Sequence, residues 1–282
     1  MGDVKTHADL QGITETLLWP LYCRAEEARR PDALIDDHNA IELRDRIDYP
    51  FADNFGSPRM SLVLRALSFD LEIKRFIQDH PTGTVVALGE GLETQFWRVD
   101  NGHVQWLSVD LPETQQLRRR LIPETPRIRV ISESALDHRW MDEVGAGPVF
   151  ITAQGLFMYL EEAEVMRLIS ACAERFPGGT LMFDAMPRWL MTRTSRGSLF
   201  SSLFIRGGKK GSQSYRLPPL RWAASAGQLQ QLRDLHPGIA EVRDVPFPPG
   251  RGFVFGFLYP RIWHSRFVRN KRPSNALVRF RT

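Results

Sequence analysis

VVALGEGLET, residues 85–94, is the stretch that decides the fold. Its first four residues are apolar and predict a buried strand, and the glycines that follow predict a tight turn where this strand ends. In an open α/β sheet, ligands bind beyond the carboxyl ends of the strands, and the first loop usually lies closest to the ligand. Gly89 and Gly91 would let the backbone approach that ligand without a Cβ atom in the way.

Two carboxylates in the same loop indicate which ligand it suits. A dinucleotide site requires G-x-G-x-x-G, but Thr94 stands at the sixth position, and Glu90 and Glu93 would repel a pyrophosphate. A sulfonium or an α-ammonium group would instead be tolerated or attracted. The loop therefore predicts a partly cationic ligand without phosphate, although the glycines alone fit a purely structural turn equally well.

Short apolar runs along the middle of the chain predict a Rossmann-like α/β sheet whose parallel strands are buried on both faces. The expected parallel strands are residues 84–88, 104–109, 127–132, 149–153 and 180–184. Two more strands are expected at residues 239–245 and 253–259, joined by the loop FPPGRG, and this short connection predicts a C-terminal antiparallel hairpin. Five parallel strands followed by a hairpin are typical of the methyltransferase variant of the doubly wound sheet.

Helical patterns precede the sheet and basic stretches follow it. Apolar residues at three- and four-residue spacing predict helices over residues 13–29 and 60–80. Glycine, serine and cations after the fifth strand predict an insertion, and the acid-free C-terminus predicts a solvated extension. The expected division is a helical lid over residues 1–80, a core over 81–262 with an insertion at about 186–222, and a basic tail over 263–282.

Composition limits the classes of function. No run approaches the roughly 20 apolar residues of a membrane span, and the N-terminus lacks the features of a secretory signal, so a cytoplasmic protein is expected. Residues 261–282 contain seven Lys or Arg and no acid, although the net charge of the chain is only +4. These cations could attract an anionic acceptor, but no nucleic-acid module is recognisable and no nucleic-acid partner is expected. Cys23 and Cys172 lack CxxC spacing and predict two reduced structural cysteines.

Polar side chains follow the second, third and fourth strands. Asp110 ends the second strand, where a carboxylate can accept hydrogen bonds from both hydroxyls of a ribose; a helix N-cap is the alternative. After the third strand, Ser134 is placed to bind an adenine amino group while Leu136 packs on the ring, with helix capping as an equally plausible role for Ser134. Gln154 opens the loop after the fourth strand, beside the place where the methyl group and its acceptor would meet.

These loops resemble those of the leucine carboxyl methyltransferase superfamily, which includes bacterial polyketide O-methyltransferases of the tetracenomycin type. The family pattern L-G-A-G-x-D-T-R is similar to LGEGLETQ, V-D-L-P-E is present intact, and E-G-x-x-x-Y-L is similar to QGLFMYL. The resemblance extends roughly over residues 13–190. It implies S-adenosyl-L-methionine as methyl donor, no metal, and O-methyl transfer to a small-molecule acceptor such as a polyketide; it leaves the oligomeric state open.

The resemblance also implies roles for single residues. Arg65 in LVLRALSFD matches the arginine that grips the carboxylate of the methionine moiety, with a salt bridge to Asp70 or Glu72 as the alternative. The remaining residues expected at the cofactor are Gly89, Glu90, Gly91, Asp110, Leu111, Ser134, Ala135, Leu136 and Gln154.

The sequence departs from the family pattern at four of these loop positions. Glu93 replaces an aspartate, Gln95 replaces a cation, Ser134 stands where an acid is common, and Gln154 replaces the glutamate that usually meets the ammonium group. Because a charge-assisted hydrogen bond is about twice as strong as a neutral one, cofactor affinity is expected to fall by about 1 kcal/mol unless Glu90 compensates. A catalytically weak relative acting as a binding protein is therefore one alternative, and an NAD(P)-dependent oxidoreductase is a less favoured one.

Methyl transfer from a sulfonium chiefly requires alignment, and a base is needed only for a protonated acceptor. A carboxylate, with a pKa near ~4, needs none, whereas a phenol near ~10 does. Tyr22, His138 and Tyr159 are the catalytic candidates, with ordinary packing or a solvent-facing position as the alternatives. The N-terminal helices and the insertion are expected to roof an acceptor pocket lined by Tyr22, Arg24 and Tyr159, which would suit an apolar acceptor with one anionic group.

Overall fold

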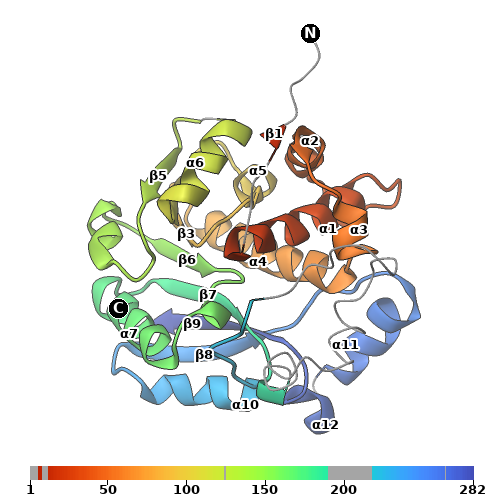
Figure 1. Ribbon diagram of the computed structural model, residues 1–282. Helices are drawn as coiled ribbons and strands as arrows, with labels where there is room; N and C mark the ends of the chain where they lie inside the picture. The colour runs from red at the N-terminus through yellow and green to blue at the C-terminus, as the bar shows by residue number, and fades with distance from the viewer. Residues whose placement is uncertain (1–5, 8–11, 124, 190–217, 264) are drawn as a thin grey trace.

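The computed structural model describes residues 6–7, 12–123, 125–189, 218–263 and 265–282 of the chain. Its centre is a seven-stranded sheet, shown in Figure 1. The parallel strands are β3 (Thr84–Leu88), β4 (Gln105–Asp110), β5 (Ile128–Ser132), β6 (Val149–Ala153) and β7 (Thr180–Ala185), and the antiparallel ones are β8 (Ile239–Val245) and β9 (Ser274–Phe280). The order across the sheet is β5-β4-β3-β6-β7-β9-β8, which confirms the Rossmann-like class, and a short parallel pair of β1 (Thr6–His7) with β2 (Ile47–Asp48) lies apart from it.

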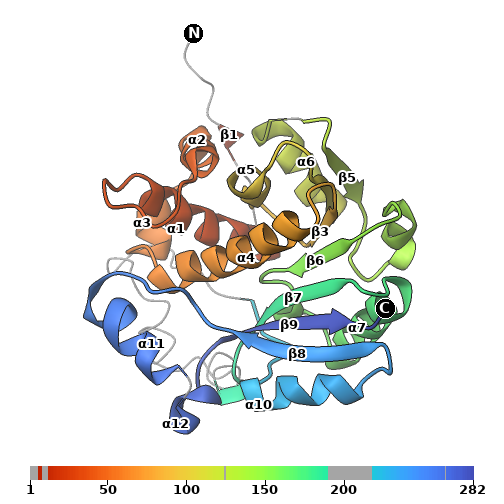
Figure 2. The same cartoon turned by 180° about the vertical axis from the view of Figure 1, so that it is seen from behind.

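Helices cover both faces of the sheet. The longest are α4 (Met60–Asp79) and α7 (Glu162–Arg175), which lie on opposite faces when Figures 1 and 2 are compared. The shorter helices are α1 (Leu18–Ala28), α2 (His38–Arg46), α3 (Phe51–Phe55), α5 (Gln95–Val99), α6 (Pro112–Leu121), α10 (Ala226–Leu229), α11 (Tyr259–Ile262) and α12 (Arg266–Arg269). The described residues also form four short 3-10 helices, η1 (Gly12–Leu17), η2 (His138–Glu143), η3 (Phe157–Tyr159) and η4 (Gln230–Asp234). A π-helix, η5, spans Phe253–Leu258.

Alternation along β3 divides the core into two layers. Val85 and Ala87 pack in the cluster that contains Phe69 of α4, while Val86 and Leu88 pack in the cluster that contains Ile169 of α7. Successive side chains of a strand point to opposite faces, so an unbroken apolar run fits a strand covered on both sides. This is why the run before the glycines predicted β3 correctly.

Helix α4 lies on the sheet, although the sequence predicted a lid that included it. Phe69 and Ile73 of α4 belong to the same buried cluster as Phe150 of β6. The helices α1, α2 and α3 lie beside one another at one end of the molecule (Figure 1) and form a second cluster, which also takes in Leu117 and Leu121 of α6. The N-terminal helices are therefore built onto the core through α6, and residue 80 marks no boundary in the packing.

The strand predicted at residues 253–259 is wrong, because these residues form η5 and the beginning of α11. An apolar run this short does not distinguish a strand from a helix. The aromatic residues Phe255, Tyr259 and Trp263 recur every four residues, which is the spacing of a helix. Their rings pack with Phe247 in a small hydrophobic cluster. A helical ridge against Phe247 buries these rings together, which a strand with its period of two would not do.

The prediction of a solvated tail over residues 263–282 is also wrong. Strand β9 lies between β7 and β8, antiparallel to both, and five of its seven residues from the start are buried in succession. Its basic neighbours are paired with acids of β8: Arg272 forms an ion pair with Asp244, and Arg279 lies 3.6 Å from Glu241. Cross-strand pairs of opposite charge stabilise a sheet, so cations that suggested a tail instead accompany an internal strand.

Other expectations concern smaller features. Cys23 and Cys172 are free and buried, and burial raises the pKa of the Cys23 thiol to about 11. No helix in the described part of the chain is both long enough and apolar enough to cross a membrane. Most of the predicted insertion at about 186–222, including the stretch RGGKKGSQS, lies outside the described residues.

Candidate functional site

The glycine loop turns sharply at the carboxyl end of β3. Gly89 and Gly91 have φ values of +60° and +57°, in the left-handed region that side chains disfavour. A Cβ atom at Gly91 would lie 2.6 Å from Leu17 of η1, and one at Gly89 would lie 2.9 Å from Leu156 in the loop after β6. Glycine is thus required at both positions by conformation and by space, and the loop is approached closely from two directions.

Asp110 stands at the carboxyl end of β4, next to the glycine loop. Its Oδ2 accepts a hydrogen bond from the Gly91 amide and its Oδ1 accepts one from the Leu111 amide, both at 2.7 Å. Burial raises the pKa of Asp110, and the two amides act in the opposite direction. Helix α6 begins without a side-chain cap, so the N-cap alternative for Asp110 is wrong. Thr114 is a further hydrogen-bond partner of this side chain, and because a carboxylate offers about four acceptor sites, capacity for another donor remains.

Arg65 projects from α4 to the loop after β6. One of its nitrogens, Nη1, lies 2.9 Å from Oδ2 of Asp184 and 3.3 Å from the position a Cβ atom would take on Gly155. Its Nε atom is buried and has no hydrogen-bond partner among the residues that the structure describes. A salt bridge, the alternative role for Arg65, is thus present, but its partner is Asp184; Asp70 and Glu72, the acids named from the sequence, bind other cations.

Asp184 is a site residue that the sequence analysis missed. It is the penultimate residue of strand β7, and its carboxylate also accepts a hydrogen bond from the Gly155 amide. The signal was available, because the acid follows an apolar run in the same way as Asp110 follows β4. Arg65 and Asp184 together fix the backbone at the start of the loop that follows β6.

Glu90 has a structural role in this loop, contrary to the expectation that it faces the cofactor and compensates for Gln154. Its Oε1 accepts a hydrogen bond from Trp106 Nε1 at 3.0 Å, and its Oε2 lies 2.8 Å from Arg118 Nη2. Burial raises the pKa of Glu90, while Arg118 opposes the rise. Both oxygens are engaged by the protein.

Glu93 belongs to a buried network of charges beneath the glycine loop. Its Oε2 lies 2.8 Å from Arg24 of α1 and its Oε1 lies 2.8 Å from Arg98 of α5. Burial alone would raise the pKa of Glu93, but Arg24 and Arg98 outweigh burial and hold it at about 2. Asp37 pairs with the same two arginines at 3.1 and 2.7 Å.

Arg98 supplies the cation that the family pattern places at position 95. Its guanidinium lies 2.7 Å from Asp70, and Gln95 donates a hydrogen bond to the same carboxylate at 2.7 Å. Positions 95 and 98 lie one helical turn apart on α5 and therefore face the same surroundings. The loss of a cation expected from Gln95 is thus made good by a residue outside the motif.

Gln154 lies at the carboxyl end of β6 and contacts this network. Its Nε2 donates a hydrogen bond to Oε2 of Glu93 at 3.1 Å. Its Oε1 atom is buried and has no hydrogen-bond partner in the described part of the chain. An acceptor without a donor is costly in a protein interior, and such atoms mark places where a ligand is expected to bind.

The loop after β5 is held by its own side chains. Ser134 Oγ accepts a hydrogen bond from the Leu136 amide at 3.2 Å, and the carbonyl of Ala135 accepts one from Trp140 Nε1 at 3.0 Å. Asp137 caps η2 through the Arg139 amide. The capping role considered for Ser134 therefore belongs to Asp137, while Ser134 closes a local turn and is half-buried two residues after β5.

The structure separates the three catalytic candidates. Tyr22 is buried among Phe51 and Phe55 and donates its hydroxyl to the Gly56 carbonyl at 3.1 Å, so it does not line an open pocket as expected. Arg24 is 1% exposed and fully engaged with acids, so it is not free to hold an acceptor.

The other two catalytic candidates, His138 and Tyr159, differ in exposure and in their distance from the site. His138 is exposed at the start of η2. Tyr159 lies close enough to Arg65 and Asp184 to sense their charges, and burial raises its pKa above the ordinary value of 10 while a hydrogen bond to Thr16 opposes the rise. Only Tyr159 of the three lies at the site, and it does so as a neutral phenol.

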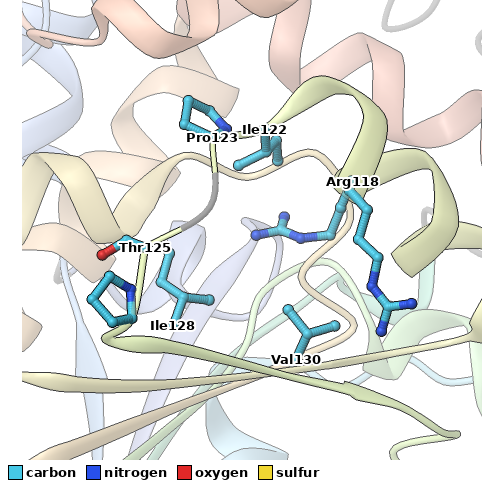
Figure 3. A pocket seen from close by; sticks show the side chains of 8 residues that line it. Arg118, Ile122, Pro123, Thr125, Ile128 and Val130 are labelled. Atoms are coloured by element: carbon cyan, nitrogen blue, oxygen red, sulfur yellow. The ribbon is translucent and has the colours of Figure 1, made fainter.

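A separate cavity of about 470 Å³ lies between α6 and the edge strand β5, as Figure 3 shows. Ile122, Ile128 and Val130 provide apolar walls, and Arg119 contributes a cation. None of the residues expected to bind the cofactor lines this cavity, and it flanks the sheet instead of facing the strand ends. We assign it no part in the site.

The residues at the strand ends fit S-adenosyl-L-methionine. Within the described ranges of the chain, Arg65 Nε is a buried donor without a partner and Gln154 Oε1 is a buried acceptor without one. The donor suits the carboxylate of an amino acid and the acceptor suits its ammonium group. Asp110 retains acceptor capacity for the hydroxyls of a ribose. Among the described residues, no group of His, Cys, Asp or Glu is arranged to hold a metal ion.

Comparisons with known proteins show the family of the chain. A model of the family described as leucine carboxyl methyltransferase matches residues 18–173. The tetracenomycin polyketide synthesis O-methyltransferase TcmP of Streptomyces glaucescens is 33% identical over 251 residues, which are 86% of this chain and 91% of that protein. The S-adenosyl-L-methionine-dependent methyltransferase dpfgK of Gibberella zeae is 26% identical over 205 residues, 64% of this chain and 68% of the relative.

A solved structure of an O-methyltransferase family protein from Burkholderia thailandensis is 18% identical, covers 95% of this chain and 70% of its own, and superimposes with a TM-score of 0.42. A likeness at this level carries no argument about function.

Proposed function

The chain belongs to the leucine carboxyl methyltransferase family and is an S-adenosyl-L-methionine-dependent O-methyltransferase, and from this premise we propose that its acceptor is the carboxylate of a small, largely apolar molecule. The oxidoreductase and the binding-protein alternatives are not favoured by these relatives.

The surroundings of Tyr159 support the choice of a carboxylate. Its phenol lies near Arg65 and Asp184, and burial raises its pKa above 10, so it is neutral at physiological pH and cannot remove a proton. Asp184 is already engaged by Arg65 and the Gly155 amide. A carboxylate acceptor is ionised without help, whereas a phenolic acceptor would need a base.

The donor supplies an activated methyl group when it is bound, so the protein has to hold it and align the acceptor oxygen. We propose that Asp110 accepts hydrogen bonds from the ribose hydroxyls, that Arg65 binds the methionine carboxylate, and that Gln154 Oε1 accepts from the α-ammonium group. Gly89, Gly91 and Leu111 would contact the nucleoside through their backbone, and Ser134, Ala135 and Leu136 would border the adenine. Accurate placement of this kind can supply several kcal/mol of a reaction barrier.

The anionic group of the acceptor is the nucleophile itself in this proposal. A second anionic group on the acceptor would need an arginine near the site to bind it. Arg24 already pairs with Asp37 and Glu93, and Arg65 pairs with Asp184 and is proposed to bind the cofactor. Tyr159, as a hydrogen-bond donor, suits the second oxygen of the reacting carboxylate. The polyketide named for the relative TcmP indicates the size of acceptor to test first.

The test is a matched pair of acceptors. The enzyme is incubated with labelled S-adenosyl-L-methionine and either an aromatic polycyclic acid or the analogue that bears a phenol in place of the acid. We expect label in the acid alone, as a methyl ester that mild alkali hydrolyses to methanol, with a rate that stays flat between pH 6 and pH 9. Methylation of the phenol alone, as an alkali-stable ether, would contradict the carboxylate assignment.

A further inference from the structure

Two positions of the site are occupied by an unusual pair of side chains. Glu93 in the glycine loop and Gln154 after β6 are hydrogen-bonded to each other, whereas the family pattern places an aspartate and a glutamate there. We propose that Glu93 is a positioning residue: it fixes the amide of Gln154 so that the carbonyl oxygen, not the NH₂ group, receives the α-ammonium group of the donor. This inference rests on the proposed cofactor site and deepens it.

The first step of the argument is that Glu93 is itself immobile. Arg24 and Arg98 each lie 2.8 Å from one of its oxygens, and the Thr94 amide donates a third contact to Oε1 at 3.0 Å. The side chain is 8% exposed. Charge-assisted hydrogen bonds in a buried setting are strong and directional, so Glu93 offers a fixed negative edge to whatever lies beside it.

The second step is that an ionised carboxylate only accepts hydrogen bonds. An amide beside it must therefore turn its NH₂ group to the carboxylate, which is the orientation found, with Nε2 of Gln154 3.1 Å from Oε2 of Glu93. The carbonyl oxygen of Gln154 is then directed away from Glu93, and it is the atom left buried without a partner. Without Glu93, either orientation of the amide would be available.

The third step is the chemistry of the ligand. An ammonium group is a donor only, so an amide that presented its NH₂ group would repel it, and an amide that presents oxygen binds it. An aspartate at position 93 would be one methylene shorter and would fall short of the amide, so the longer acid and the amide are needed together.

A double-mutant cycle tests this coupling by calorimetry with S-adenosylhomocysteine, which has the same amino-acid group and cannot react. We expect Glu93→Asp to weaken binding about tenfold, because the shorter acid releases the amide. Gln154→Glu places two carboxylates side by side, and like charges raise the pKa of one of them. Affinity of Gln154→Glu should therefore rise from pH 5 to pH 8, while wild-type affinity stays flat.

The double variant Glu93→Asp with Gln154→Glu recreates the family pair and should bind within about threefold of wild type, less than the two single changes would give if they were independent. Additive losses together with flat pH profiles would overturn the positioning role. Glu162→Gln removes an exposed acid from the start of α7 and is the control for charge alone. Thermal unfolding of each variant checks that the fold is retained.

Failure of the inference and failure of the proposed function are distinguishable. If wild-type protein does not bind S-adenosylhomocysteine, the cofactor site itself is misassigned. If wild type binds and the cycle is additive, the site stands and only the positioning role of Glu93 falls.

Discussion

The strand ends around the glycine loop and the C-terminal segment from β8 to β9 are built on different principles. Around the glycine loop, the functional residues stand at the ends of their own strands: Asp110 is the last residue of β4, and Gln154 directly follows β6. In the C-terminal segment, β9 inserts between β7 and β8, and a helical excursion of nearly thirty residues separates the two antiparallel strands. The first region is specified by short stretches of sequence, and the second by pairing between distant ones.

This difference predicts that the two regions fail in different ways. Changes around the glycine loop should abolish binding with modest effects on stability, because the strand ends pack little core. Changes around Arg272 should lower stability and leave binding intact, because Arg272 contacts Trp263, Asp244 and Ser274, none of which is proposed to bind the cofactor. Asn275 of β9, which pairs with Asp184 of β7, is where this segment meets the site. Each of the following variants tests whether binding and stability are lost separately in the two regions.

Arg272→Ala should have the largest effect, on stability alone. Arg272 is 4% exposed, forms an ion pair with Asp244, and its guanidinium lies 3.3 Å from the centre of the Trp263 ring. Removal of one partner from a buried pair costs about 3–5 kcal/mol. Urea unfolding should report this loss, with affinity for S-adenosylhomocysteine within twofold of wild type. The control is Arg279→Ala, whose exposed pair with Glu241 should cost less than about 1 kcal/mol.

Asp110→Ala should have the next largest effect, on binding. Two charge-assisted hydrogen bonds to the ribose at about 1.5–3 kcal/mol each would be lost, partly offset by water, so affinity for S-adenosylhomocysteine should fall on the order of 100-fold. Calorimetry measures the loss and circular dichroism the fold. Asp137→Ala, an acid that follows β5 but caps η2, should leave affinity unchanged. Undiminished affinity in folded Asp110→Ala would remove Asp110 from the site.

Arg65→Met is best made together with Asp184→Asn, so that no buried acid is left without its cation. We expect about a tenfold loss of affinity for S-adenosylhomocysteine, from the lost contact with the methionine carboxylate. Decarboxylated S-adenosylhomocysteine lacks that carboxylate and should bind wild type and the double variant equally. If the double variant still prefers the intact ligand, Arg65 serves only to hold the loop after β6.

Tyr159→Phe should have the smallest effect. A neutral phenol that donates one hydrogen bond to the acceptor contributes about 1 kcal/mol, so kcat/KM should fall about fivefold, with the shape of its pH profile unchanged between pH 6 and pH 9. A base would instead show a loss that grows with the pKa of the acceptor. His138→Ala, at an exposed position, should leave kcat/KM unchanged and is the control.

The sequence specified the region of the glycine loop well because its signals are local. The apolar runs of β3 to β7 and the acid after β4 could be recognised within a few residues of themselves. The sequence did not show which acids of the glycine loop bind cations of the protein and which are free to bind a ligand. Glu90 and Glu93 look alike in the motif, and only the positions of Arg118 and Arg24, each from another helix, show that both are held by internal cations.

Strand β8 and the antiparallel hairpin were predicted, but the helical course of the chain after β8 and the position of β9 could not be, for a complementary reason. Phe253–Leu258 resembles a strand in composition, and its helical period becomes decisive only when Phe247 is known to lie beside it. The cations around β9 suggest solvent until Asp244 and Glu241 are placed on the neighbouring strand. Pairing over long distances in sequence leaves no local mark, so such elements are found only in three dimensions.

Hydrogen exchange with and without S-adenosylhomocysteine tests the central claim most directly. Bound ligand should protect the amides of residues 88–94, 110–112 and 154–159, where the proposed contacts lie, and should leave residues 239–245 and 274–280 unchanged. Protection confined to the C-terminal strands, with the glycine loop unaffected, would contradict the account.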